Sequence, residues 1–445
     1  MAFARIRFGK WINVHFDSVG RIRGAEIQTY LLEKARVIHQ TPGERNYHIF
    51  YQLCCAAKDT PVLQDLGLAD ATVFNYTKGC ITANNVDDEA EYKEMKEALT
   101  YIGFDEAATQ AIFGAVSACL HVGNLAMEED KDGNALIKDD SHLVAVASLL
   151  NVESDAIRKA ICSRMIHAGG EVMVKPETYE RANQCRDALA KALYNNLFEY
   201  LVSRVNSALD VKGGESTIEV SVLDIFGFEV FQINHFEQFC INHANEKLQL
   251  HFNHYNFMLE RELYAAEDIE FVATDFQDNS ECIDLLEAKG WGIQATLDDV
   301  CNTPKGDDTI FLERLLQSGQ MKSSKYFTAP KVRNNTFVVN HYAGSVAYNV
   351  EDFCEKNKDA LAVDLVHLVQ GSTSKFLQKL FEEHVSPEQA AKNAAHGGDS
   401  GHRMAHKSVS MTFKQDLGHL MDGINLADPH FVRCVNPNAQ KKAEC

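Results

Sequence analysis

The chain has 445 residues, of which 45% are hydrophobic and 24% are charged, so it can form two or three subdomains with apolar cores, and disorder is not expected. Its 63 acidic and 43 basic residues give a net charge of −20 without an evident basic stripe, which excludes nucleic acid as a partner. No apolar run approaches the roughly 18 residues of a membrane span, so direct membrane insertion is excluded as well.

The cysteine pattern favours free thiols. Twelve cysteines are scattered along the chain without any C-x-x-C pair, so neither a zinc site nor a small disulfide scaffold is indicated. Reduced thiols in a cytosolic protein are the simplest explanation. The first residues, MAFARIRFGKW, lack the apolar stretch of a secretory signal.

The first half of the chain alternates between predicted strands and helices. Residues 5–17 and 21–32 alternate apolar and polar side chains and predict a β-hairpin. Residues 44–57 predict an apolar helix, and the acidic stretch 86–113 is also helical in pattern. Leucines at helical spacing predict a further helix over 184–209, which the KGG sequence that follows would end.

Residues 217–226, TIEVSVLDIF, form a short β-rich apolar run, which predicts a buried strand. A long helix is predicted from residue 236 to about residue 264. Asn234 and Glu237, three residues apart, have the spacing of a capping box at its start.

The last part of the chain predicts four features. Residues 334–350 alternate and predict two short strands, and residues 388–406 are rich in Ala, Gly and His and predict an exposed flexible loop. A helix over 409–424 and a strand over 430–435, HFVRCV, follow.

Asp224 and Gly227 close the apolar run in the order D-x-x-G. In nucleoside-triphosphate hydrolases an aspartate at such a strand end holds Mg²⁺, usually through water. A glycine lets its backbone N–H approach a terminal phosphate because no side chain intervenes. Taken alone, the pattern is more often an ordinary strand-to-loop turn.

Glu229 follows two residues after Gly227, and Arg7 lies on the first predicted strand. An Arg–Glu pair across a phosphate site could hold two loops together; the alternative is that Arg7 is a solvated strand residue. His251 and His254 could ligate a metal from the long helix, but no third ligand is evident, so no metal is expected there.

A longer stretch resembles a known family. Residues 223–257 read LDIFGFEVFQINHFEQFCINHANEKLQLHFNHYNF, which resembles the second switch and the relay helix of the myosin motor domain. Other segments resemble the same family in family order: RFGKW, ERNYHIFYQL, LHVGNLAM, YNNLFEYLVSRVN, NHYAGSVAYNVEDFCEKNKD and DPHFVRCVNPN. So many segments in order make the resemblance far more specific than D-x-x-G alone.

The resemblance implies an α/β fold, namely a partial P-loop NTPase-type mixed sheet flanked by many helices, with upper and lower actin-binding subdomains. We expect residues 1–230 to form the partial sheet and the upper subdomain, and residues 231–385 to form the relay helix and the lower subdomain. Residues 386–408 would be a flexible actin-contacting loop. Residues 409–445 would be a helix plus a core strand, the start of the next motor segment.

The resemblance also implies ATP and Mg²⁺ as cofactors. Asp224 matches the aspartate that holds Mg²⁺ through water, and Gly227 matches the glycine whose N–H meets the γ-phosphate. Arg7 and Glu229 match the salt bridge that closes the two switches and helps to position the attacking water. Residues 235–262 match the relay helix, which transmits switch movement to the lever.

The implied macromolecular partner is the actin filament. Residues 278–316 match the helix-loop-helix of the lower actin-binding half, and Lys392, Arg403 and Lys407 supply the positive charge of the flexible loop. Residues 417–439 match a further actin-binding segment, although HFVRCV is more typical of a core strand. The candidate contact residues there are Leu417, Leu420, Met421, Pro429, His430, Phe431, Arg433, Asn436 and Pro437.

The sequence departs from the family at the phosphate site. It contains no G-x-x-x-x-G-K-[S/T] motif, whose backbone N–H groups and lysine cradle the phosphates. Its one Gly-Lys pair, at residues 9 and 10, is followed by Trp11, and Arg5 and Ile6 stand where the family has serines.

In the family's sheet, the strand that feeds the phosphate loop lies between those matching 217–226 and 430–435, and it is missing from these residues. The family also continues beyond the last residue with a reactive-thiol helix, a converter and a lever, so light chains and tail partners are not encoded here. We therefore expect a truncated chain that begins within the first switch.

Three functions compete at this stage. The first is an actin-activated ATPase motor, cytoplasmic and associated with the cytoskeleton. The second is a non-catalytic actin-binding fragment, which the missing phosphate loop favours for the chain as written. The third is a kinesin-like motor, which also uses D-x-x-G but which the aromatic DIFGFE and the NHYAG segment disfavour.

Overall fold

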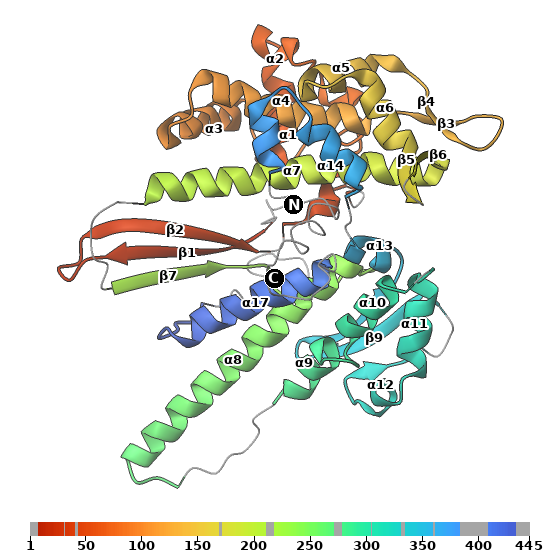
Figure 1. The fold of residues 1–445 in the computed structure, drawn as a ribbon. Coiled ribbons are helices and arrows are strands. Elements are labelled where there is room, and N and C mark those ends of the chain that lie inside the picture. The colour runs from red at the N-terminus through yellow and green to blue at the C-terminus, as the bar shows by residue number, and fades with distance from the viewer. Residues whose placement is uncertain are drawn as a thin grey trace. The chain divides into compact units, whose positions relative to one another are not determined.

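The structure of the chain is a computed structural model that describes residues 8–30, 32–40, 43–168, 171–210, 218–270, 278–303, 305–330, 334–358, 361–382 and 408–432. The chain divides into two compact units (Figure 1). Unit 1 comprises Met1–Ile225 and Asp359–His406, and unit 2 comprises Phe226–Lys358 and Lys407–Cys445. These bounds differ from the predicted subdomain limits.

The sheet of unit 1 has the order β2-β1-β7. Strands β1 (Gly9–Phe16) and β2 (Ile22–Tyr30) pair antiparallel, which confirms the predicted hairpin. The carboxylate of Asp17 fixes the turn by accepting hydrogen bonds from the N–H groups of Val19 and Arg21. The third strand, β7 (Ile218–Asp224), pairs antiparallel with β1.

The expectation that residues 217–226 form a buried strand was wrong about burial. β7 is a strand, but Ile218, Val220 and Val222 on one of its faces are 49%, 51% and 54% exposed. Within the described residues, β7 pairs only with β1 and carries no neighbour on its other edge. An apolar run predicts burial only where another layer packs against it, and none of the described elements covers this strand.

Helices form the core of unit 1. The predicted helix 44–57 is α1 (His48–Ala56), and the acidic stretch 86–113 is divided between α3 (Asp88–Ile102) and α4 (Glu106–Gly123). Gly103 ends α3 with a left-handed φ of 96°, and the Asp105 side chain caps α4 by accepting from Ala108 N–H. Helix α4 is almost completely buried from Ile112 onward.

Helix α7 (Tyr179–Leu209) contains the predicted helix 184–209 and starts five residues earlier, after the Thr178 cap. It packs against α4 in the core of unit 1. Near its end, the Asn206 side chain accepts a hydrogen bond from Ile27 N–H and donates one to Ile27 C=O, both at 2.8 Å. These bonds attach α7 to strand β2. The KGG sequence lies outside the described residues.

Smaller elements complete unit 1. They are η1 (Lys34–Val37), α2 (Pro61–Asp65), η2 (Ala71–Val73), β3 (Met127–Glu129), β4 (Ala135–Ile137), α5 (Asp140–Leu150), α6 (Ser154–Cys162), β5 (Ser163–Ala168), β6 (Glu171–Pro176), α14 (Val363–Gln370) and α15 (Lys375–Leu380). Apolar residues of α14 and α15 belong to the same core as α4 and α7.

The predicted long helix is α8 (Phe236–Ala266), which begins unit 2. Its N-cap is His235, and Gln238 Oε1 accepts from His235 N–H at 3.0 Å, so the predicted pair Asn234 and Glu237 is displaced by one residue. Asn234 instead binds the backbone of Phe231 and donates to Ala347 C=O on a neighbouring strand. The capping position was therefore decided by a long-range contact.

The two strands predicted over 334–350 are confirmed as β9 (Thr336–His341) and β10 (Gly344–Asn349), which pair antiparallel beside β8 (Phe327–Thr328). Aromatic rings build the core beneath them. Phe239 from α8 contacts Phe337 and Tyr348 edge-on, with ring centroids 6.1 and 5.5 Å apart. Edge-to-face packing of this kind adds stability beyond apolar burial.

The remaining elements of unit 2 are α9 (Ser280–Glu287), α10 (Ile293–Cys301), α11 (Asp308–Gln317), α12 (Gly319–Ser323), α13 (Phe353–Lys358) and α17 (Val409–Asn425). Helix α17 confirms the prediction for 409–424. Residues 430–432 of the predicted strand are not in a strand, and the rest of HFVRCV lies outside the described residues. Among the described helices, none is both long and apolar enough to cross a membrane.

Candidate functional site

Asp224 is the last residue of β7, in unit 1. Its carboxylate lies 3.3 Å from Lys10 Nζ on β1, where the two residues are register partners. Their side chains are 41% and 36% exposed, so this ion pair contributes little stability. The carboxylate is thus accessible from solvent and can exchange its lysine partner for a hydrated divalent cation.

Gly227 lies in the segment without regular structure after β7 and is exposed. A Cβ atom built on it would meet no atom within 4 Å, and its φ lies outside the left-handed region. Neither crowding nor backbone conformation therefore requires glycine at this position. A requirement for glycine would come from a bound group that approaches the backbone closely.

Two asparagines of α8 hold the segment around Gly227. Asn245 Nδ2 donates to Phe226 C=O at 2.9 Å. Asn242, which is fully buried, accepts from Glu229 N–H and donates to Glu229 C=O, both at 2.8 Å. The backbone of residues 226–229 is therefore fixed to the first turns of α8 by three hydrogen bonds.

The same network continues into the hairpin of β9 and β10. Asn242 Nδ2 also donates to Tyr348 Oη at 2.9 Å, and Tyr348 Oη lies 2.8 Å from His341 Nε2. His341 Nδ1 lies 2.8 Å from a carboxylate oxygen of Glu246, and Asn279 Nδ2 donates to the other oxygen at 2.7 Å. Both His341 and Glu246 have side chains with no exposed surface, so each depends on the other for its polar contacts.

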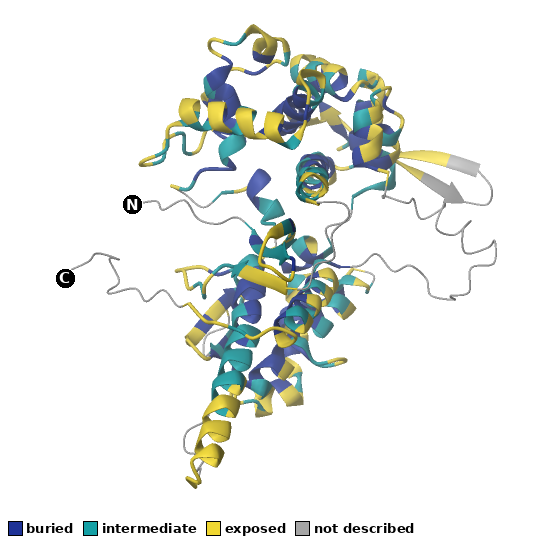
Figure 2. Cartoon of the chain, turned by 90° about the vertical axis from the view of Figure 1, so that its left-hand side faces the viewer, coloured by how far each residue is buried: buried dark blue, intermediate teal, exposed yellow. Residues whose placement is uncertain are grey.

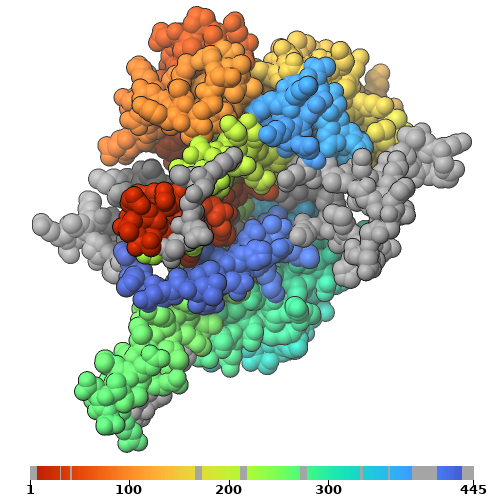
Figure 3. All heavy atoms as spheres, turned by 60° about the vertical axis from the view of Figure 1, so that its left-hand side comes forward, coloured from red at the N-terminus to blue at the C-terminus, as the bar shows by residue number. Residues whose placement is uncertain are grey.

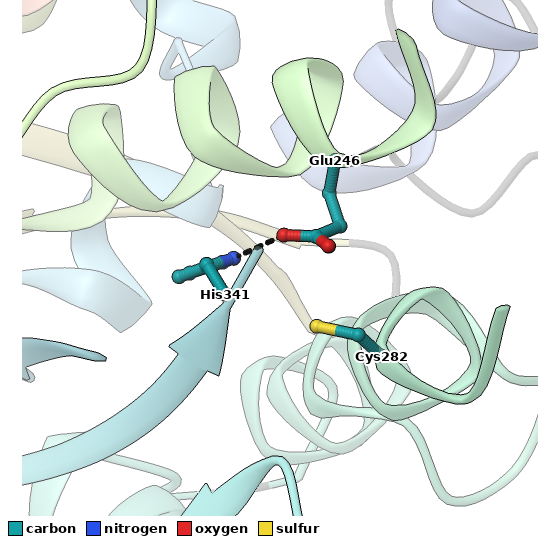
Figure 4. Close-up of side chains that lie close together, drawn as sticks. All are labelled: Glu246, Cys282 and His341. Atoms are coloured by element: carbon teal, nitrogen blue, oxygen red, sulfur yellow. Dashed lines mark hydrogen bonds and ion pairs between the residues drawn. The ribbon is translucent and has the colours of Figure 1, made fainter. Parts of the chain in front are cut away.

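Glu246, His341 and Cys282 converge from α8, β9 and α9 (Figure 4). Their ligand atoms all lie within 4.8 Å of one another, the one such cluster among the described residues. Burial and the adjacent Glu246 carboxylate raise the pKa of the Cys282 thiol, which opposes the thiolate that a zinc ion needs. Hydrogen bonds already occupy Glu246 and His341, so the cluster fits a structural network better than a metal site.

Several predicted site residues lie outside the described residues. Arg7 is one of them, so its predicted pairing with Glu229 stays a prediction. The same holds for the loop cations Lys392, Arg403 and Lys407, and for Arg433, Asn436 and Pro437.

The predicted actin-facing part of α17 needs a correction. Leu417 and Leu420 are each only 2% exposed, because they share the inward stripe of this helix with Phe413 and Ile424. Their spacing of three and four residues places them in the core of unit 2 rather than on a surface.

The remaining described candidates are more accessible. Met421 and Pro429 are half-buried and His430 is exposed. Phe431 is 37% exposed and packs edge-on against Phe252 of α8, with ring centroids 4.9 Å apart.

Sequence reasoning missed the polar residues that organise the site. Asn242 and Glu246 are four residues apart on the buried face of α8, and Asn245 lies between them. Polar side chains at helical spacing among buried apolar ones were the available signal, because such groups need partners. The partners themselves, His341 and Tyr348, come from a strand pair about a hundred residues later, which spacing along α8 does not reveal.

Comparisons with known proteins agree with this arrangement. A model of the family described as "Myosin head (motor domain)" matches residues 5–445. The chain is 40% identical to human unconventional myosin-Vc over 98% of its own length and 25% of that protein. It is also 40% identical to the myosin-I heavy chain of Dictyostelium discoideum, over 98% of this chain and 18% of that one.

A third relative is myosin-14 of Arabidopsis thaliana, at 38% identity over 97% of this chain and 28% of the relative. The chain thus spans between about a fifth and about a quarter of the relatives named here. Because the family model covers almost every residue, the chain belongs to the myosin head (motor domain) family.

Proposed function

We propose that this chain is part of an actin-based motor that couples ATP hydrolysis to movement along actin filaments. The family match over residues 5–445 carries this proposal. It also removes the reason to consider a kinesin-like motor. The chain spans 25% of human unconventional myosin-Vc, so the activity of the complete protein is proposed from the family.

Within such a site, the residues would have distinct roles. Asp224 would hold Mg²⁺ through water after giving up its contact with Lys10. Gly227 would leave the backbone N–H open to the γ-phosphate, and Glu229 would pair with Arg7 to position the attacking water. The metal would neutralise charge that develops on the phosphate oxygens during in-line attack.

The hydrogen bonds of Asn242 and Asn245 support a coupling between this site and α8. Residues 226–229 cannot shift without stretching these bonds or moving the start of α8. We therefore propose that α8 serves as the relay helix and that a nucleotide-dependent movement of residues 226–229 changes its orientation.

The residues present fit only part of a nucleotide. Asp224 and Gly227 suit the metal and the terminal phosphate, but the sequence contains no phosphate-loop motif to surround the remaining phosphates. We propose that the chain as written binds ATP weakly and does not hydrolyse it alone. The second candidate function, a non-catalytic actin-binding fragment, rests on this observation.

The proposed actin contacts are the accessible candidates. They are Met421, Pro429, His430 and Phe431, together with Lys392, Arg403, Lys407, Arg433, Asn436 and Pro437. Because the chain carries a net charge of −20, contact with an acidic filament would depend on such local cations and apolar groups. The location that follows is the cytoskeleton.

Co-sedimentation with actin filaments tests the partner. The 445-residue chain should pellet with actin at about 50 mM salt and less at about 300 mM salt, because screening weakens the cationic contacts. Phe431→Ala should reduce pelleting, whereas Leu426→Ala, at a 91% exposed position in the same segment, should not. Absence of pelleting at low salt by the folded chain would contradict an actin-binding role.

Titration with a fluorescent ATP analogue and Mg²⁺ tests the nucleotide site. We expect no saturation at micromolar analogue, and no difference between the chain and its Asp224→Asn variant. Micromolar binding that Asp224→Asn weakens would show that these residues hold nucleotide without a phosphate loop, and the non-catalytic alternative would then be wrong.

A further inference from the structure

Two cysteine thiols of unit 2 lie together although they are 53 residues apart in the sequence. Cys301 is the last residue of α10, and Cys354 is the second residue of α13. The Cys301 Sγ lies 3.6 Å from the backbone oxygen of Cys354, and the two thiols are also within hydrogen-bonding reach of each other. The fold therefore places the two sulfur atoms in mutual contact.

The two thiols differ in accessibility. Cys301 is half-buried, so a small oxidant in solution can reach its sulfur, whereas Cys354 is only 2% exposed. This is the arrangement of an attacking thiol that meets the oxidant first and a second thiol, protected from solvent, that can resolve the oxidised product.

Polar groups around Cys301 favour its ionised form. The Cys354 thiol is a hydrogen-bond donor to the Cys301 sulfur, Asn357 Nδ2 lies 3.7 Å from it, and the Lys358 ammonium contributes positive charge. These groups together lower the pKa of Cys301, in that order of importance, against the opposing effect of burial. Thiolates, not thiols, react with peroxide, so this environment promotes oxidation.

Other described cysteines have the opposite environment. Burial raises the pKa of Cys54 and of Cys119 to about 12, and it also raises the pKa of Cys282 and Cys240. Among the described cysteines with a shifted pKa, Cys301 is the one whose pKa is lowered. Oxidation by a mild reagent should therefore be selective for this position.

Asn357 is itself held in place, which keeps the pair ordered. Its Nδ2 donates to Asp298 Oδ1 at 2.8 Å, and its Oδ1 accepts from Ser410 N–H at 2.9 Å. Ser410 Oγ also donates to Asp298 at 2.7 Å. The thiol pair therefore sits beside a buried connection between α10, α13 and the first turn of α17.

We propose that Cys301 and Cys354 form a site of reversible oxidation, at which hydrogen peroxide generates a disulfide that joins α10 to α13. The Cys301 thiolate attacks one peroxide oxygen, the O–O bond breaks, and hydroxide leaves to give a sulfenic acid on Cys301. The Cys354 sulfur then attacks the Cys301 sulfur, the S–O bond breaks, and water leaves. Two thiols lose two hydrogens and two electrons, and one peroxide becomes two waters.

Peptide mapping of the reduced 445-residue chain after treatment with a few equivalents of hydrogen peroxide tests the proposal. The mass should fall by about 2 Da, and a non-reducing digest should contain the peptide of Cys301 linked to that of Cys354. A thiol reductant should reverse both changes. This test uses the unaltered chain and so does not depend on whether a variant folds.

Variants sharpen the assignment. Cys301→Ser should abolish the linked peptide, and Cys354→Ala should direct Cys301 to the sulfinic acid, with a gain of about 32 Da. Cys80→Ser is the matched control, because Cys80 is also half-buried but its sulfur contacts the carbonyl oxygens of Gly43 and Thr82. This variant should form the linked peptide as the unaltered chain does.

Two results would overturn the proposal. One is a chain in which peroxide converts Cys301 to the sulfinic acid while Cys354 is present and no linked peptide forms. The other is a first-formed disulfide between different cysteines, with Cys301 still reduced. Either result would mean that the contact between the two thiols is only a packing contact.

Discussion

Helices α7 and α8 have 31 residues each, but they are supported along different parts of their length. In α7, buried residues extend from Ala182 to Leu197, and Asn206 attaches its last turns to strand β2. In α8, buried residues stop at Glu246, and every residue from Met258 to Ala266 is exposed (Figure 2). The second half of α8 projects from the rest of unit 2 (Figure 3).

The difference separates a core element from one that is anchored at a single end. A helix of 31 residues is about 45 Å long, so a small tilt at the anchored end of α8 displaces its far end considerably. The anchored turns of α8 are also those that bind residues 226–229 through Asn242 and Asn245. Helix α7, packed on several sides, could not move in this way without disrupting the core of unit 1.

Truncation of a core leucine in α7 should have the largest effect. Leu193 has no exposed surface, and Leu193→Ala should lower the free energy of unfolding of unit 1 by about 3–5 kcal/mol through lost burial and a residual cavity. Urea unfolding, monitored with hydrogen exchange in α4 and α7, measures this loss. A cost below about 1 kcal/mol would mean that α7 is not the core element described above.

Removal of the Asn242 side chain should have the next largest effect. Asn242→Ala deletes the hydrogen bonds to Glu229 N–H, Glu229 C=O and Tyr348 Oη in a fully buried position, at a cost of about 2–3 kcal/mol. Amide exchange at Glu229 should become faster. The matched variant Asn245→Ala removes the bond to Phe226 C=O and should cost about 1 kcal/mol. Equal effects of the two variants would contradict the central role of Asn242.

Acid should weaken unit 2 through Glu287, the last residue of α9. Burial would raise the pKa of this carboxyl, but hydrogen bonds and charges from His243 and Lys247 outweigh it and bring the pKa to about 2. Lys247 Nζ, 2.8 Å away, is the permanent cation, because full burial lowers the pKa of His243. The carboxylate thus stabilises the folded state above its unfolded pKa of about 4.3, and this contribution is lost as the pH falls toward 2.

The expected size of this effect is about 2 kcal/mol, which is less than the full pKa shift implies because the pair is partly solvated. Urea unfolding at pH 5 and at pH 3 measures it. Glu287→Gln should show a smaller loss between these two pH values than the unaltered chain. Identical losses would mean that the Lys247–Glu287 pair does not contribute to acid sensitivity.

The smallest effect should come from the exposed end of α8. Leu263 is 61% exposed, so Leu263→Ala should change the free energy of unfolding by no more than about 0.5 kcal/mol. It is the counterpart of Leu193→Ala in a helix of equal length, and urea unfolding compares the two directly. A cost above about 2 kcal/mol would show that the far end of α8 is packed in solution, and the comparison would fail.

The sequence predicted local structure well where the signal was local. Alternation predicted the hairpin of β1 and β2, and periodicity predicted α7, α8 and α17. The break between α3 and α4 was missed although Gly103 and Asp105 are a helix stop and a helix cap in the sequence itself. The predicted capping box failed for a different reason, because Asn234 donates to Ala347, more than a hundred residues away.

The candidate site was predicted in part. The sequence identified Asp224, Gly227 and Glu229 as a group, because the order of acid, glycine and acid after an apolar run is itself the signal. It could not identify Lys10 as the partner of Asp224, or Asn242 as the partner of Glu229, because strand register and helix docking decide which side chains meet. It also assigned Leu417 and Leu420 to a surface, although they are core residues.

The sequence by itself determined the family, the position of the D-x-x-G group and the order of the main helices and strands. Those depend on motif order and on periodicity within one segment, which are properties of neighbouring residues. Only the tertiary structure decided that β7 is exposed, that Glu246 meets His341, and that Cys301 meets Cys354. Each of these depends on which distant elements pack together, and therefore on the free energy of the whole fold rather than of any one segment.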